Sequence, residues 1–335
     1  MEALAAEPLR LGLVGLGLWG PNLARNFDDL PDADLVWLCD EDADKLERYG
    51  ARHPAARTTL RFGDLLEDAE LDAVVVATPA VTHFDLASQA LAAGKHAFVE
   101  KPLALSSTLA AELVALAGER DLVLMPGHLL LYHPGVEKLK ELVDSGELGR
   151  ILYVYGNRQN FGQIRRDENA LWSLGAHDLS VILHLLGEEP SESLARGESL
   201  LRREGVEDVV FCYLRFPSGI VAHMHLSWLD PHKMRRMTVV GDRRMAVFDD
   251  MELERKVTVY DKRPEERAET YGEWMTRTGD IWSPKIANDE PLRLECERFL
   301  ALLRGEGDRR EAAQNGLAVV RALEQLQASL ERERV

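Results

Sequence analysis

Side chains able to do chemistry follow several predicted strands at the points where those strands end. The apolar run at residues 73–77 leads into Thr78-Pro79, and the run at residues 96–99 leads into Glu100-Lys101-Pro102. In an open parallel sheet, ligands bind at the carboxyl ends of the strands. We therefore expect a binding site where these strand ends meet, with Lys101 as its most reactive group.

A lysine at such a strand end can hydrogen-bond a substrate hydroxyl and place a positive charge beside it. That charge stabilises the alkoxide that develops on deprotonation, which helps hydride to leave the same carbon. Pro102 stiffens the turn that carries Lys101, because proline has a fixed φ and no N–H. The alternative is a surface lysine that only ends a strand, and Lys101 taken alone does not separate the two.

A glycine pattern comes earlier in the chain, between an apolar run at residues 9–14 and a helical pattern that opens with Pro21. It has the form G-x-G-x-x-G. In a dinucleotide-binding turn the first glycine permits a tight bend, the second lets a pyrophosphate approach the backbone, and the third lets helix and strand pack closely. The helix N-terminus then favours the anion. The residues expected to contact the dinucleotide are Gly15, Gly17, Leu18, Trp19 and Gly20.

An acidic residue ends the next predicted strand, residues 34–39, and supports the same interpretation. This residue is Asp40, 20 positions after Gly20. A carboxylate there binds the adenosine ribose hydroxyls of NAD and repels the 2′-phosphate of NADP. No Arg or Lys follows before Lys45, which also favours NAD. The alternative is a glycine turn in another α/β protein, but strand, helix and acid together favour a dinucleotide site.

The elements that must position these residues change character near residue 126. Strand and helix patterns alternate up to that point, which predicts a doubly wound parallel sheet of the Rossmann type at residues 1–126. Strands dominate afterwards, and Pro217-Ser218-Gly219 predicts a hairpin turn. We expect residues 127–335 to form an α+β domain with an open, mainly antiparallel sheet. Residues 261–289 are polar and poorly periodic, and we predict a long loop there.

Composition limits the partners. The 335 residues are 46% hydrophobic and carry a net charge of −17, which argues against nucleic acid or an acidic membrane surface. No apolar run is long enough for a bilayer, and the first ten residues lack the layout of a signal peptide.

Three scattered cysteines give no disulfide framework, so a reducing cytoplasm is expected. His223 and His225 point the same way on a strand, but no third ligand follows, and we expect no metal.

Taken together, the motifs resemble the Gfo/Idh/MocA family, the group of glucose–fructose oxidoreductase and inositol dehydrogenase. The resemblance covers nearly the whole chain, and it is the order and spacing of short motifs that make it specific. It implies a Rossmann domain with an open-faced sheet domain, oxidation or reduction of a sugar or cyclitol hydroxyl, and homodimers or homotetramers formed through the sheet face. The motifs are GLGLWGPN at residues 15–22, Ala77-Thr78-Pro79 with His83, Glu100-Lys101-Pro102, Gly127-His128, Gly149-Arg150-Ile151, Gly175-Ala176-His177-Asp178, and Glu290-Pro291-Leu292 with Glu295 and Phe299.

The resemblance also implies roles for single residues. Lys101 corresponds to the family's catalytic lysine, which polarises the hydroxyl, and His177 to its catalytic histidine. A neutral imidazole can accept the hydroxyl proton near neutral pH. Further cofactor-binding residues are Thr78, Pro79, His83, Glu100 and Lys101. Expected substrate-binding residues are Lys101, His128, Arg158, Asn160, Trp172, Ser173, His177 and Tyr271, with Phe161 and Trp282 as further aromatic candidates.

The chain departs from the family at Ser173, where many members carry an Asp four residues before the catalytic histidine. A serine holds no negative charge at neutral pH, so the dyad is either missing or partly replaced by Asp178. The opening glycine turn and the layout of residues 172–177 are most similar to the nucleotide-sugar and polysaccharide branch. This similarity favours a nucleotide-linked or free hexose, oxidised at C3. Two alternatives stay open: an NAD-dependent glycosidase of the same fold, and a non-catalytic NAD-binding subunit.

Overall fold

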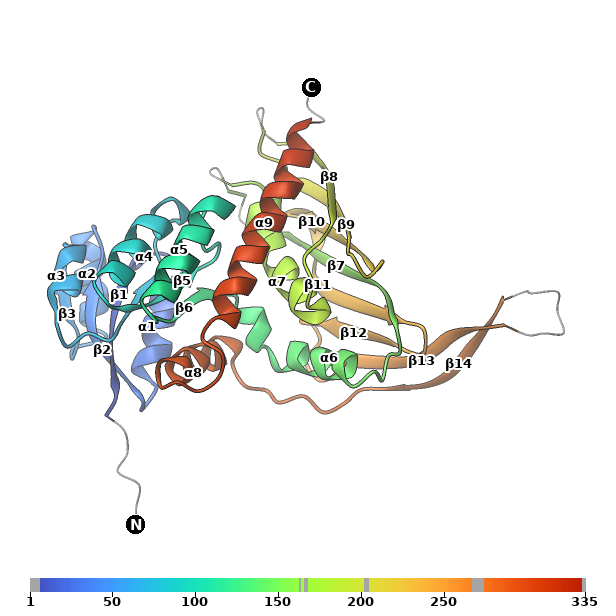
Figure 1. Ribbon diagram of the computed structural model, residues 1–335, viewed down its shortest axis with the longest axis horizontal. Coiled ribbons are helices and arrows are strands. Elements are labelled where there is room, and N and C mark those ends of the chain that lie inside the picture. Colours follow the sequence, from blue (N-terminus) through green and yellow to red (C-terminus); the bar gives the residue numbers. More distant parts are fainter. Residues whose placement is uncertain (1–6, 163, 166–167, 202–204, 267–273, 333–335) are drawn as a thin grey trace, which may run out of the picture. The chain divides into compact units, whose positions relative to one another are not determined.

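The computed structural model describes residues 7–162, 164–165, 168–201, 205–266 and 274–332 (Figure 1). The chain forms two compact units. The first contains the chain up to Leu129 together with Glu290–Val320, and the second contains Leu130–Asp289 together with the chain from Arg321 onward. The sequence predicts one domain boundary, after residue 126. The structure differs because residues 290–320 belong to the first unit and not to the second.

A six-stranded parallel sheet forms the centre of the first unit, in the order β3-β2-β1-β4-β5-β6. This is the doubly wound order, in which strand addition reverses direction between β1 and β4. All four residues of β4 are fully buried, as expected for a strand covered on both faces. The predicted Rossmann sheet is confirmed. Its strands are β1 (Leu9–Val14), β2 (Ala33–Cys39), β3 (Arg57–Thr59), β4 (Ala73–Val76), β5 (His96–Glu100) and β6 (Leu124–Gly127).

An aromatic cluster explains why residues 290–320 return to the first unit. Phe27, Phe98 and Phe299 are fully buried and meet edge to face, with ring centroids 5.6 to 6.2 Å apart. Phe299 therefore completes a core that begins more than two hundred residues earlier in the chain. The helices of this unit are α1 (Gly20–Asp28), α2 (Ala43–Gly50), α3 (Phe62–Glu67), α4 (His83–Ala92) with the 3-10 turn η1 (Ala80–Thr82), α5 (Ser107–Glu119) and α8 (Pro291–Leu303).

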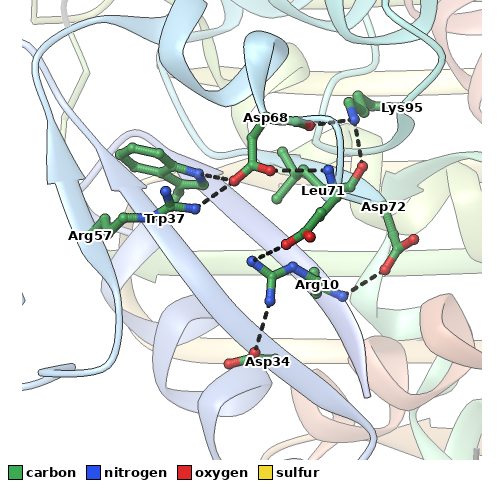
Figure 2. A network of polar contacts seen from close by, with 9 residues as sticks. Arg10, Asp34, Trp37, Arg57, Asp68, Leu71, Asp72 and Lys95 are labelled. Carbon is green, nitrogen blue, oxygen red and sulfur yellow. Dashed lines mark hydrogen bonds and ion pairs between the residues drawn. The ribbon is translucent and has the colours of Figure 1, made fainter. Parts of the chain in front are cut away.

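A polar network fixes the chain where it enters β4 (Figure 2). The Asp68 carboxylate accepts hydrogen bonds from Trp37 Nε1 at 2.8 Å and from the Arg57 guanidinium at 2.5 Å. Lys95 is only 6% exposed, and its ammonium donates to the carbonyl oxygens of Asp68 and Leu71, each at 2.7 Å. A buried ammonium needs such acceptors, because burial of an unpaired charge is costly. The network anchors the amino end of β4, so the carboxyl end is left for the site.

An eight-stranded sheet forms the second unit, in the order β14-β13-β12-β11-β7-β10-β9-β8. Every neighbouring pair is antiparallel except β7 with β10, so the predicted mainly antiparallel sheet is confirmed. The predicted hairpin turn joins β9 to β10. The strands are β7 (Ile151–Phe161), β8 (Glu192–Glu198), β9 (Val209–Arg215), β10 (Val221–Ser227), β11 (Leu229–Gly241), β12 (Met245–Asp249), β13 (Val257–Glu266) and β14 (Trp274–Trp282).

The prediction of a long loop over residues 261–289 is wrong for residues 261–266 and 274–282, whereas residues 283–289 contain no helix or strand, as predicted. Strands β13 and β14 pair antiparallel there, with Arg263 opposite Arg277. Residues 275–281 of β14 are all exposed. A strand with no buried face lacks the alternation of apolar and polar residues by which strands are recognised in a sequence.

One face of the second sheet is covered by helices, and the other is open. The covering helices are α6 (Pro134–Asp144) and α7 (Ala176–Leu186), with the π-helical turn η3 (Leu171–Gly175) before α7; the short turn η2 (Leu129–Tyr132) precedes α6, and α9 (Glu311–Arg332) ends in this unit. On the open face Tyr155 stacks on His223 with centroids 5.0 Å apart, and Phe211 stacks on His225 at 4.4 Å. Within the described part of the chain, no helix is long and apolar enough to cross a membrane.

Candidate functional site

The glycine turn between β1 and α1 adopts a backbone that only glycine permits. Gly15 has φ +98°, and a Cβ on it would lie 2.6 Å from the Ala77 carbonyl oxygen. A Cβ on Gly20 would lie 1.8 Å from the Gly15 carbonyl oxygen. At Gly17 the space that a Cβ would enter holds no protein atom within 4 Å. The turn thus leaves open backbone for a ligand, as a pyrophosphate site requires, and the neighbouring Leu18 side chain is 66% exposed.

Asp40 lies directly after β2 and holds this turn in place. One oxygen of its carboxylate accepts the Leu16 N–H at 2.6 Å, and the other accepts the Asp42 N–H at 2.9 Å. The side chain is 9% exposed, so a narrow part of the carboxylate remains available to a ribose.

Lys45 modifies the charge at Asp40, which the sequence does not reveal. Its ammonium lies 3.3 Å from one carboxylate oxygen of Asp40. The absence of a basic residue between Asp40 and Lys45 in the sequence is an argument for NAD over NADP. Because Lys45 reaches back from the first turn of α2 and offsets part of the Asp40 charge, that argument is weakened. The strand-end position of Asp40 still supports it.

His83 is buried, and this corrects its predicted contact with the cofactor. The ring is 1% exposed and lies between two carbonyl oxygens, with Nε2 2.9 Å from that of Thr78 and Nδ1 2.7 Å from that of Pro102. The Lys101–Pro102 peptide bond is cis. His83 therefore joins the loop after β4 to the turn that carries Lys101.

Three buried ionisable groups surround the carboxyl ends of β5 and β6. Burial raises the pKa of Glu100 to about 7, and it raises the pKa of Glu295 well above its ordinary value. Burial also lowers the pKa of His128 to about 3, and Lys101 adds to that shift. At neutral pH His128 is therefore uncharged. Glu100 and His128, predicted to touch ligands, are 8% and 1% exposed. Glu100 accepts the Lys101 N–H at 3.1 Å and so supports the turn of Lys101, whereas both ring nitrogens of His128 are buried with no hydrogen-bond partner among the described residues.

A buried ion pair joins β7 and α7 in the second unit. Arg158 on β7 donates from Nε to Asp178 Oδ1 on α7 at 2.7 Å, and both side chains are at most 10% exposed. Asp178 pairs with Arg158 through Oδ1, while its Oδ2 is buried with no hydrogen-bond partner among the described residues, so the expectation that Asp178 partly replaces the missing family Asp stays a prediction. Arg158, predicted to contact substrate, offers little surface for that purpose. The pair instead fixes α7 against the sheet.

The remaining predicted substrate residues lie in different parts of the second unit. Trp172 and the buried Ser173 belong to η3, and His177 is the second residue of α7, half-buried. A π-helical turn is an uncommon element that recurs at functional sites. Asn160 and Phe161 end β7, with Phe161 76% exposed.

Two aromatic candidates fall elsewhere. Tyr271 lies outside the described residues. Trp282 ends β14, beneath the Arg244 guanidinium at 4.9 Å, and is therefore separate from the group around α7.

Comparison with known families identifies both units. Residues 9–128 match an oxidoreductase family described by its NAD-binding Rossmann fold, and residues 136–247 match the GFO/IDH/MocA C-terminal domain. The chain is 30% identical over 242 residues to UDP-N-acetylglucosamine 3-dehydrogenase of Acidithiobacillus ferrooxidans, covering 72% of this chain and 74% of that protein. It is 28% identical over 249 residues to myo-inositol 2-dehydrogenase of Thermotoga maritima, covering 72% of each.

Solved structures give the same result over the whole chain. The UDP-N-acetylglucosamine 3-dehydrogenase GnnA of Acidithiobacillus ferrooxidans superposes with a TM-score of 0.84 and 26% identity, covering 98% of this chain and 99% of that one. GenD2 from gentamicin A biosynthesis, solved in complex with NAD, superposes with a TM-score of 0.82 and 26% identity, covering 99% and 97%. The first unit is thus an NAD-binding domain, and its open glycine backbone and strand-end carboxylate fit that cofactor.

The two contacts of Asp40 yield a test of cofactor choice. Asp40→Asn keeps an oxygen for the Leu16 N–H but removes the charge, so we expect the ratio of NAD to NADP affinity to fall about tenfold. Asp40→Ala also frees the turn and should weaken both cofactors, NAD more than NADP. Lys45→Met should raise the ratio. Titration calorimetry measures all three variants, and equal losses for NAD and NADP in Asp40→Asn would contradict the assignment.

Proposed function

Because the chain belongs to the Gfo/Idh/MocA family of oxidoreductases, we propose that it is an NAD-dependent dehydrogenase of a nucleotide-linked hexose, acting on the C3 hydroxyl. Its relatives are named as dehydrogenases of sugars, cyclitols and nucleotide sugars. The observation that carries the narrower proposal is the similarity to UDP-N-acetylglucosamine 3-dehydrogenase, which appears both in sequence and over nearly the full length of the fold.

The first unit supplies the cofactor site in this proposal. The open backbone at Gly17 and the N-terminus of α1 receive the pyrophosphate, and Asp40 binds the adenosine ribose. When bound, NAD supplies the acceptor for hydride. The buried contacts of His83 and Glu100 hold the backbone turn that carries Lys101.

Lys101 and His177 carry the acid–base part of the reaction. Lys101 donates a hydrogen bond to the substrate hydroxyl and stabilises negative charge on its oxygen as the proton leaves. An imidazole nitrogen of His177 accepts that proton. In the reverse direction the same nitrogen returns the proton to a ketone oxygen, which Lys101 polarises.

Ser173 supports a substrate other than a cyclitol. It lies four residues before His177 on η3, is 8% exposed, and carries no charge that would raise the basicity of the histidine. The neighbouring Asp178 shares its charge with Arg158 through Oδ1. In this proposal His177 therefore acts as the base without the acidic neighbour that family members with an Asp at this position have.

The roles of Lys101 and His177 are tested by substitution. We expect Lys101→Ala and His177→Ala each to lower turnover about 100-fold or more while NAD affinity stays within a few-fold, since removal of a general base or a charge-stabilising group acts on the transition state. Lys138→Ala, at a half-exposed lysine on α6 that pairs with Glu141, is the matched control. Turnover is followed by absorbance of the reduced cofactor over a panel of sugars, UDP-sugars and inositols.

Each rival has its own outcome in the same panel. Full activity in both variants contradicts the assigned roles. Release of an aglycone with no net reduced cofactor favours the NAD-dependent glycosidase. A non-catalytic subunit is favoured if the protein binds NAD tightly, turns over no compound of the panel, and keeps the same NAD affinity in Lys101→Ala.

We also propose that the chain forms a homodimer or homotetramer through the open face of the second sheet. Phe211 is 53% exposed there, Leu194 46% and Tyr153 36%, next to the Tyr155–His223 stack. Exposed apolar and aromatic surface of this kind is typical of an interface between copies. We expect sedimentation velocity at micromolar concentration to show an oligomer that Phe211→Glu with Leu194→Glu dissociates, whereas Leu253→Glu, at an 89% exposed residue, does not. A monomeric wild type would contradict the proposal.

A further inference from the structure

A hollow of about 300 Å³ in the second unit is lined mainly by arginines. It lies between the loop after α6, the turn joining β11 to β12, and the part of the β13–β14 hairpin near the sheet. Its charged lining residues are Glu147, Arg243, Arg244, Asp261, Arg263 and Arg277. The residues expected to bind cofactor or substrate are not among them, so the hollow is additional to the proposed function and does not depend on it.

Positive charge exceeds negative charge around this hollow. Four guanidinium groups face two carboxylates, and one of these, Glu147, is bound by Arg244 at 2.8 Å. Within the described part of the chain, Arg243, Arg263 and Arg277 form no ion pair with an acid. This concentration of positive charge occurs in a chain whose net charge is −17.

The strand pairing in the β13–β14 hairpin makes this excess of positive charge destabilising. Arg263 and Arg277 lie directly opposite each other on β13 and β14. Like charges in a directly opposed cross-strand pair destabilise a sheet. A bound anion removes that repulsion, and it does so most strongly when it contacts both guanidinium groups.

We propose that this hollow binds a small molecule bearing a phosphate or diphosphate group. Arginine binds phosphate oxygens through paired N–H donors, which suits a multiply charged oxyanion better than a single carboxylate. The volume lies at the lower end of the range for small-molecule sites. Arg244 is already held by Glu147 and by the face of Trp282, so one of the four donors is placed before the ligand arrives.

Calorimetric titration of the full-length protein tests the proposal. The protein is first saturated with NAD, so that pyrophosphate does not bind at the glycine turn. We expect saturable binding of pyrophosphate, and weaker binding of orthophosphate. In Arg263→Ser with Arg277→Ser the pyrophosphate affinity should fall at least tenfold. The matched control, Arg310→Ser with Arg332→Ser, removes the same charge from exposed sites and should leave the affinity unchanged.

Arg243→Ser keeps the hairpin intact and should weaken pyrophosphate binding by a few-fold, which separates loss of the site from loss of the hairpin fold. The proposal is overturned if wild type shows no saturable binding at millimolar pyrophosphate. It is equally overturned if the paired hairpin variant and Arg243→Ser both bind as wild type does. Succinate bound as tightly as pyrophosphate would show that the hollow does not select phosphate.

Discussion

The hydrogen bond from the Leu16 N–H to the Asp40 carboxylate joins the ends of β1 and β2, and the cofactor site depends on it. Gly15 turns the chain through a positive φ that other residues resist, and the bond to Asp40 holds the chain in that turn. The same carboxylate is the group assigned to the ribose. One side chain thus holds the backbone of the glycine turn and is also the group that we propose contributes to cofactor choice, while Lys45 offsets part of its charge.

His83 does for β4 and β5 what Asp40 does for β1 and β2. Its two ring nitrogens face the carbonyl oxygens of Thr78 and Pro102, so the loop after β4 and the turn of Lys101 are held by one buried side chain. Glu100 is also buried and accepts the Lys101 N–H at 3.1 Å. The backbone of Lys101 is therefore held by buried polar contacts on both sides, which are rigid when they are satisfied.

Sequence reasoning predicted the features that local chemistry dictates. The parallel sheet, the glycine turn and the place of Asp40 follow from apolar runs and from conformations that only glycine adopts. The return of α8 could not be predicted, because Phe299 meets Phe27 and Phe98 only in the folded chain. The partners of long side chains could not be predicted either. Lys45 forms an ion pair with Asp40, and Arg158 forms a buried ion pair with Asp178. The β13–β14 hairpin was missed because an exposed strand shows no apolar period.

The central claim, oxidation of a sugar carbon by hydride transfer to NAD, is tested most directly with deuterium. The protein is incubated with NAD and ring-deuterated forms of the panel sugars, led by a UDP-linked N-acetylhexosamine deuterated at C3. The reduced cofactor is then analysed by NMR and mass spectrometry. The account predicts one deuterium at nicotinamide C4, transferred from the C3 position. Reduced cofactor without deuterium, or deuterium lost to solvent with no reduced cofactor, would contradict it.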